Sequence, residues 1–232
     1  MSNSLYEAGV IPAVSCRLPT ALLTTKSAVG RFAQVMTGCL SAAWRPVLGR
    51  VSGETFVPPG VFAVDEGHPT PCGPVEDDDY AFYCGANLGI YFDWEMFAAV
   101  DEGDRLDTEI DLMDMVAHEY GHHMQLLSRI DERYELRYDD TTGEARLRLT
   151  RRMELQANCF AAAFLGANRR PLKLTGDRLE YLMFAIEAGD DPEAGPADHG
   201  SEESNRYWGR AAFKSGSPQS CNTWSAPVDR VK

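Results

Sequence analysis

Apolar residues recur at helical spacing at residues 25–47 and 108–130, where they stand three or four residues apart, as they do when one face of a helix is buried. An apolar run within residues 146–167, a short stretch at residues 178–187 that ends near Gly189, and acidic residues after Ser201 in residues 201–214 indicate further helices. Pro46 closes the first pattern, and Ser201 stands where the N-cap of the last helix is expected. We therefore predict five helices.

Short apolar runs between prolines and glycines predict strands at residues 61–64, 81–84 and 89–92. The second and third runs are joined by a turn at residues 85–88, so they predict a small sheet placed just before the helix at residues 108–130. The predicted fold class is α+β, mostly helical with a small antiparallel or mixed sheet.

Three other stretches lack a regular pattern. Residues 1–25 contain Pro12 and Pro19, which predicts an extended segment lying along the rest of the molecule. Residues 131–144 are charged and rich in turn formers, and we expect them to form an exposed connection that can also shape a substrate cleft. The acidic run at residues 76–79 lacks the glycine spacing of a calcium loop, so a solvated turn is expected there rather than a cation site.

The net charge and the hydropathy of the chain limit the classes of partner that it can bind. The 232-residue chain carries a net charge of -13, with 22 Lys and Arg residues against 35 Asp and Glu residues. This balance argues against nucleic acid or an anionic membrane surface as the main partner. No apolar run approaches the roughly 20 residues of a membrane helix, and the first residues lack the order of charges and apolar residues typical of a signal peptide. The sequence predicts no oligomeric state.

The six cysteines favour disulfide bonds over a structural zinc site, because they are even in number and include no Cys-x-x-Cys pair. Sequence alone cannot choose among the possible connectivities, and we predict the pairing of neighbours along the chain. The alternative is six reduced, buried thiols in a cytosolic enzyme. The predicted pairs are Cys16 with Cys39, Cys72 with Cys84, and Cys159 with Cys221.

The strongest candidate chemistry lies in the predicted helix at residues 108–130. His118, Glu119 and His122 form a His-Glu-x-x-His pattern. Helix positions four apart lie on one face, about 6 Å apart along the axis, so both imidazoles can reach one metal ion. Glu119 lies about 100° round the helix and can take a proton from water without being a ligand. The same pattern also arises by chance on a solvated helix face.

A further ligand would separate these two interpretations, and the next predicted helix supplies a candidate. Glu154 and Asn158 stand four residues apart at the start of the helical stretch at residues 146–167, so they share one of its faces. Glu154 is thus available as a third metal ligand.

Several short motifs now stand in a fixed order along the chain, and together they resemble the neutral zinc metallopeptidases of bacteria. The resemblance runs from about residue 70 to the end of the chain. Its motifs are Cys72-Gly73, Ala81-Phe82-Tyr83-Cys84, Ile90-Tyr91-Phe92-Asp93, His118-Glu119-Tyr120-Gly121-His122-His123, Glu154-Leu155-Gln156-Ala157-Asn158-Cys159-Phe160, His199-Gly200 and Cys221-Asn222-Thr223-Trp224.

The resemblance implies a zincin-like fold with a small sheet beside the metal helix. It implies a Zn²⁺ ion held by His118, His122 and Glu154, with Glu119 as the general base. We expect residues 1–60, an extension and a helix, to pack on a catalytic domain at residues 61–232 as one structural unit. Many family members carry an N-terminal transmembrane segment, so the resemblance and the six cysteines together predict an extracellular or cell-envelope location.

One position departs from the family pattern. The family usually has Asp where this chain has Asn158, and that Asp accepts a hydrogen bond from a zinc-bound histidine. An amide oxygen can accept the same bond, but without a full negative charge it makes the imidazole a weaker donor to the metal. We expect lower metal affinity or activity with the site retained.

The expected function is hydrolysis of peptide bonds in a peptide or protein substrate by a zinc-activated water. His199, Tyr120 and Tyr207 are candidate donors to the oxyanion, and His199 is preferred because it lies in a glycine-rich loop before a helix. We expect His123 to have a supporting or structural role and His68 to be a loop residue.

Two alternatives remain at the level of sequence. One is a catalytically weak or inactive zincin-like module that binds or regulates a partner at the cell surface. The other is a zinc hydrolase acting on a non-peptide amide.

Overall fold

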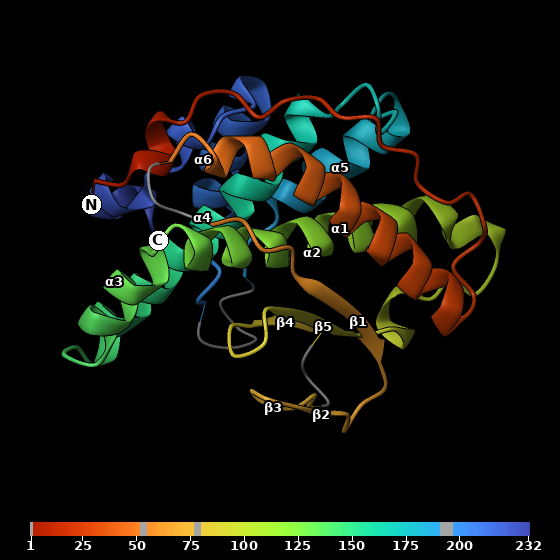
Figure 1. The fold of residues 1–232 in the computed structure, drawn as a ribbon, viewed down its shortest axis with the longest axis horizontal. Helices are drawn as coiled ribbons and strands as arrows, with labels where there is room; N and C mark the ends of the chain where they lie inside the picture. The colour runs from red at the N-terminus through yellow and green to blue at the C-terminus, as the bar shows by residue number, and fades with distance from the viewer. Residues whose placement is uncertain (1, 52–54, 77–79, 191–196) are drawn as a thin grey trace.

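The computed structural model describes residues 2–51, 55–76, 80–190 and 197–232 (Figure 1). All five predicted helices are present, together with one that the sequence did not predict. The helices are α1 (Lys26–Leu48), α2 (Arg105–Leu127), α3 (Ile130–Tyr138), α4 (Gly143–Ala167), α5 (Asp177–Glu187) and α6 (Glu202–Ser215). Short 3-10 turns occur at Ser4–Glu7, Glu95–Phe97, Glu102–Asp104, Pro218–Cys221, Thr223–Ser225 and Val228–Arg230.

Side-chain caps begin two of the predicted helices. Thr25 caps α1 by accepting a hydrogen bond from the backbone N–H of Ala28, and Ser201 caps α6 by accepting one from Ser204. Each cap satisfies a backbone donor that has no partner within the helix. Pro46 lies in the last turn of α1, and the helix continues past it to Leu48.

Residues 131–144 are largely exposed, as predicted, but most of them form helix α3, which the sequence did not predict. Arg129, in the left-handed conformation with φ of 58°, separates α3 from α2. Within α3 only Ile130 is buried, so the helix shows no apolar stripe in the sequence. Contacts with α4 hold it in place, since α3 packs on α4 and the guanidinium of Arg146 lies 4.5 Å from the centroid of the Tyr138 ring.

The predicted strands form a three-stranded mixed sheet in the order β1-β5-β4. β1 (Gly60–Val64) runs parallel to β5 (Gly89–Asp93), and β4 (Ala81–Cys84) runs antiparallel to β5. β4 is therefore an edge strand, and it contacts α2. A separate two-stranded ladder joins β2 (Pro69–Thr70) to β3 (Gly73–Pro74). Residues 77–79 of the predicted acidic turn lie outside the described residues.

Helix α2 lies at the centre of the molecule. Figure 1 shows the three-stranded sheet on one side of α2 and helices α4, α5 and α6 on the other, and α2 contacts α4, α5 and the sheet. Helix α2 approaches α4 closely at Gly121, where an added Cβ would lie 2.7 Å from the backbone oxygen of Ala157. The two helices that carry the candidate ligands therefore pack backbone to backbone.

The N-terminal segment packs against the same core as the rest of the chain. Leu5 and Ile11 are buried in the apolar cluster that includes residues of α2 and α4. Asn168, just after α4, accepts a hydrogen bond from the backbone N–H of Val14 at 2.8 Å. These contacts hold the extended segment along the body of the molecule.

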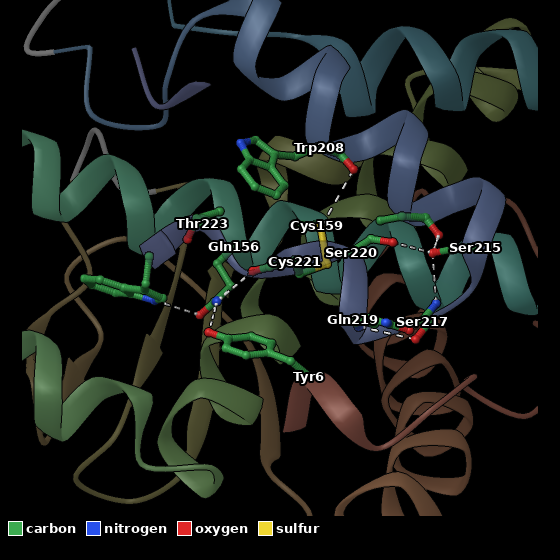
Figure 2. The surroundings of a disulfide bond; sticks show 12 residues. Tyr6, Gln156, Cys159, Trp208, Ser215, Ser217, Gln219, Ser220, Cys221 and Thr223 are labelled. Carbon is green, nitrogen blue, oxygen red and sulfur yellow. Dashed lines mark hydrogen bonds between the residues drawn. A yellow bond between two sulfur atoms is a disulfide. The ribbon is translucent and has the colours of Figure 1, made fainter. Parts of the chain in front are cut away.

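The three predicted disulfide pairs are confirmed: Cys16–Cys39, Cys72–Cys84 and Cys159–Cys221. The Cys159–Cys221 bond is buried and joins α4 to the C-terminal segment (Figure 2). Three disulfides indicate an oxidising, extracellular environment. Every helix in the described parts of the chain is too short or too polar to cross a bilayer.

Candidate metal centre

Helices α2 and α4 bring His118, His122 and Glu154 together. The Nε2 atoms of the two imidazoles lie 3.1 Å apart. Oε2 of Glu154 lies 3.3 Å from Nε2 of His118 and 3.2 Å from Nε2 of His122. Three atoms with lone pairs therefore form a nearly equilateral triangle.

This triangle has the size that a tetrahedral zinc ion requires. Ligand atoms about 2.0–2.1 Å from a tetrahedral zinc lie about 3.3–3.4 Å from one another. The three measured separations are 3.1, 3.2 and 3.3 Å. Two imidazole nitrogens and one carboxylate oxygen are also ligands that zinc prefers. The residues present therefore fit this metal.

Burial and charge couple the three side chains. Burial by itself would lower the pKa of His122, but the carboxylates of Glu154 and Glu119 outweigh it and raise that pKa to about 9. Burial would likewise raise the pKa of Glu154, but His122 and His118 hold it well below its usual range. In the absence of metal, the positive charge of a protonated imidazole thus balances the negative charge of the buried Glu154 carboxylate.

His118 is oriented by the amide of Asn158. The Oδ1 atom of Asn158 lies 2.5 Å from Nδ1 of His118, so Nδ1 carries a proton and Nε2 is the nitrogen left to bind a metal. The Nδ2 atom of Asn158 donates to Oδ1 of Asn205 on α6 at 2.8 Å. Asn158 therefore lies beside a candidate ligand and contacts a second amide on α6.

His122 is oriented by a second amide, that of Gln125. Nδ1 of His122 lies 2.9 Å from Oε1 of Gln125, and Nε2 of Gln125 donates to the backbone oxygen of Met153 at 2.8 Å. Gln125 also donates to Oε1 of Gln156 at 3.2 Å. Gln156 in turn donates to the hydroxyl of Tyr6 and to the backbone oxygen of Cys221, beside the disulfide (Figure 2).

Neutral amides thus set the tautomer of both imidazoles. Of the three amides, only Asn158 was predicted from the sequence; Gln125 and Asn205 were not. Gln125 stands three residues after His122, within reach on the same helix, and this spacing was a signal that could have revealed it. Asn205 lies 47 positions from Asn158, and no local pattern connects the two residues.

Glu119 lies beside the triangle without joining it. It lines the same cleft of about 430 Å³ as His118, His122 and Glu154, and its side chain is largely buried. This is the arrangement expected of a base next to a metal. The cleft is also lined by Ala81, Phe82 and Tyr83 of the edge strand β4 and by Asp131, Tyr134 and Glu135 of α3.

His199 is held over the triangle by the loop before α6. Its Nε2 lies 3.8 Å from Oε2 of Glu154, and its Nδ1 lies 2.9 Å from Oδ1 of Asp198. The Oδ2 atom of Asp190 accepts hydrogen bonds from the backbone N–H groups of His199, at 2.6 Å, and Gly200, at 3.1 Å. His199 is thus directed toward the cleft while it remains about half exposed.

The other candidate donors lie elsewhere. Tyr120 is fully buried, and its hydroxyl donates to Ser41 on α1. Tyr207 stacks against the guanidinium of Arg230, 4.3 Å from the ring centroid. Neither tyrosine lines the cleft that contains the triangle.

The two remaining histidines fall where they were expected. His123 is fully buried, with Nδ1 2.9 Å from the hydroxyl of Tyr83 and Nε2 2.8 Å from the backbone oxygen of Val57. It therefore ties α2 to β4. His68 lies in the turn before β2, as predicted for a loop residue.

Comparison with known sequences assigns the chain to a family. Residues 16–224 match the family described as "Putative neutral zinc metallopeptidase". The chain belongs to this family. The match covers both helices that form the triangle, and the family description implies zinc as the metal. The mostly helical fold with a small mixed sheet is consistent with a zincin-like architecture.

Relatives with similar sequences include proteins from two bacterial groups. The uncharacterized protein YpfJ of Escherichia coli K12 is 29% identical over 212 residues, which cover 85% of this chain and 72% of that protein. The uncharacterized protein Mb2605 of Mycobacterium bovis is 29% identical over 233 residues, which cover 87% of this chain and 74% of that protein. No solved structure matches the chain significantly.

Proposed function

We propose that this family member is a zinc-dependent peptidase that hydrolyses peptide bonds, with His118, His122 and Glu154 as zinc ligands. The observation that carries this proposal is the convergence of Nε2 of His118, Nε2 of His122 and Oε2 of Glu154 to within 3.1–3.3 Å of one another. Three protein ligands leave a fourth position of a tetrahedral metal open to solvent or substrate, as in catalytic rather than structural zinc sites.

Glu119 acts as the general base in this proposal. Zinc, when bound, polarises the scissile carbonyl and makes a water molecule more acidic. Glu119 lines the same cleft, takes the proton from the attacking water and returns it to the leaving amine. Its place on α2, one residue after His118, keeps its carboxylate beside the ligands without adding it to them.

His199 donates a hydrogen bond to the oxyanion that forms on the carbonyl. Its Nε2 faces the cleft, 3.8 Å from Glu154, while Nδ1 lies beside the carboxylate of Asp198. That carboxylate is placed to accept a hydrogen bond from Nδ1, so Nε2 is the ring nitrogen that faces the oxyanion.

The edge strand β4 offers a surface for an extended peptide. The backbone N–H of Asp93 donates to the oxygen of Tyr80, and hydrogen-bonded pairs alternate along an antiparallel ladder. The backbone groups of Ala81 and Tyr83 therefore point away from β5, toward the open edge. An extended substrate can pair with these groups across the cleft from the triangle.

Location and partners follow from the same features. The three disulfides and the family resemblance support an extracellular or cell-envelope location, where the substrate is a peptide or a protein. The acidic charge of -13 argues against nucleic acid as a partner.

The proposal is tested with zinc-loaded protein and a mixed peptide library analysed by mass spectrometry. We expect cleavage that a chelator abolishes and added zinc restores. Glu119→Gln, which keeps the shape of the side chain, should retain zinc and lose most of the cleavage. Unchanged cleavage by Glu119→Gln would exclude Glu119 as the base. Full zinc occupancy without cleavage of any peptide would support the inactive binding module instead.

A further inference from the structure

Asn158 and Asn205 form a pair of amides between α4 and α6, and one end of this pair contacts a proposed zinc ligand. Asn205 is 1% exposed and lies in the first turn of α6. Its Nδ2 atom lies 3.2 Å from the backbone oxygens of His199 and Gly200 and 3.4 Å from that of Ser201. Carbonyl oxygens only accept hydrogen bonds, so the NH₂ group of Asn205 must face them.

The orientation of the Asn205 amide fixes the orientation of the Asn158 amide. With its NH₂ group facing the three carbonyls, Asn205 presents Oδ1 to Asn158, and the atom of Asn158 that meets it at 2.8 Å must be a donor. The opposite atom of Asn158 is then the oxygen, which lies 2.5 Å from Nδ1 of His118. The backbone of the His199 loop thereby sets which nitrogen of His118 carries the proton.

We propose that Asn205 is a positioning residue that couples the His199 loop to the orientation of His118, and that Asn158 serves this coupling because it is an amide. A carboxylate at position 158 could still accept from His118, but it would place a second acceptor against Oδ1 of Asn205. An aspartate at position 158 would therefore leave Oδ1 of Asn205 without the donor that Asn158 provides. The inference rests on the proposed zinc site, and it does not require peptide hydrolysis.

The surrounding charges support a neutral side chain at position 158. Asp111, Asp114, His118 and Asn158 line one small cavity beside the cleft. Burial, with a further contribution from Asp111, raises the pKa of Asp114 to about 6, although His118 opposes this shift. A carboxylate at position 158 would add another negative charge to a cavity where an existing carboxylate is already costly to ionise.

The test is a double-mutant cycle on the zinc-free protein at pH 7.5, measured by thermal unfolding. Asn158→Asp should lower the melting temperature by roughly 3–8 °C, because a buried acceptor loses its donor. In the Asn205→Ala background the same change should cost less than half as much, because the opposing oxygen is gone. Gln34→Glu, an exposed change on α1 that adds the same charge, should leave the melting temperature unchanged.

The positioning role is tested separately by zinc affinity. Asn205→Ala should weaken zinc binding about tenfold although Asn205 contacts no ligand. Ser204→Ala, a change of the buried neighbour that bonds to the backbone of Lys232, should leave the affinity unchanged. If Asn205→Ala does not fold, Asn205→Ser takes its place in both measurements.

Two results would overturn the inference. One is an equal cost of Asn158→Asp in the two backgrounds, which means that the amides are not coupled. The other is unchanged zinc affinity in the Asn205 variant. Neither measurement uses peptide cleavage, so failure of the peptidase proposal would remain distinguishable from failure of this one.

Discussion

At the scale of single residues, His199 has two possible relations to the zinc site, as a fourth ligand or as a hydrogen-bond donor to the substrate. Its Nε2 lies 3.8 Å from Oε2 of Glu154, whereas the two histidines of α2 lie 3.2–3.3 Å from the same atom. Its side chain is 54% exposed, in contrast to 14% for His118 and 19% for His122. This geometry favours a donor at the rim of the cleft.

The corresponding prediction is that His199→Ala retains zinc and loses turnover. Removing one oxyanion donor typically lowers kcat by about 10²-fold or more. Zinc content by elemental analysis should remain at the wild-type level, and kcat should fall with little change in KM. Loss of zinc from His199→Ala would instead identify His199 as a ligand.

Single residues also show how far the sequence could predict the site. The ligand triangle was predictable because His118 and His122 stand four residues apart, which places them on one face of a helix. Glu154 lies in a second sequence motif, at residues 154–160. Asn205 was not predictable, because its role depends on the packing of α6 against α4, which brings together residues 47 positions apart.

At the scale of elements, the geometry of the triangle depends on how closely α2 and α4 approach. An added Cβ at Gly121 would lie 2.7 Å from the backbone oxygen and 2.8 Å from the Cα of Ala157. These are backbone atoms, so the helices themselves must separate to make room. Ala157 lies in α4 three residues after Glu154, and any separation there moves Glu154 away from the two histidines.

We therefore predict that Gly121→Ala lowers zinc affinity at least tenfold and destabilises the protein by about 1–3 kcal/mol. Isothermal titration with zinc and thermal unfolding measure the two effects. Gly38→Ala is a matched control, because Gly38 is exposed in α1 and nothing lies within 4 Å of an added Cβ. It should stabilise α1 by about 0.5–1 kcal/mol and leave zinc affinity unchanged. Wild-type affinity in Gly121→Ala would show that the site tolerates helix separation.

Elements with an apolar periodicity were predicted well, and those without it were missed. The five predicted helices and the three strands of the mixed sheet each bury an apolar face. Their apolar residues therefore form recognisable patterns along the sequence. Helix α3 is exposed on most of its surface and is held by tertiary contacts such as the stacking of Arg146 on Tyr138. Its existence is a property of the folded molecule rather than of its local sequence.

At the scale of the whole molecule, the Cys159–Cys221 disulfide ties the C-terminal segment to the helix that carries Glu154. Gln156 donates a hydrogen bond to the backbone oxygen of Cys221 beside this bond (Figure 2). Gln156 also accepts a hydrogen bond from Gln125, which contacts the candidate ligand His122. The disulfide closes a sequence separation of 62 residues, compared with 12 residues for Cys72–Cys84.

The longer loop predicts the larger effect on stability. Replacing both Cys159 and Cys221 by Ser should cost about 4 kcal/mol, against about 3 kcal/mol for the Cys72 and Cys84 pair. The difference between these two losses of stability should be larger still, because Cys159 and Cys221 are fully buried whereas Cys72 is exposed. Denaturant unfolding of the two double variants gives this comparison. Equal or smaller destabilisation by the Cys159 and Cys221 replacements would contradict the predicted order.

The most direct test of the zinc site is the zinc content of the purified protein and of Glu154→Ala, measured by elemental analysis after dialysis. Glu144→Ala is the matched control, since Glu144 lies in the same helix with a side chain that is 60% exposed. We predict about one zinc per chain in the wild type and in Glu144→Ala, and a loss of most of the zinc in Glu154→Ala. Full occupancy in Glu154→Ala would contradict the proposed ligand set.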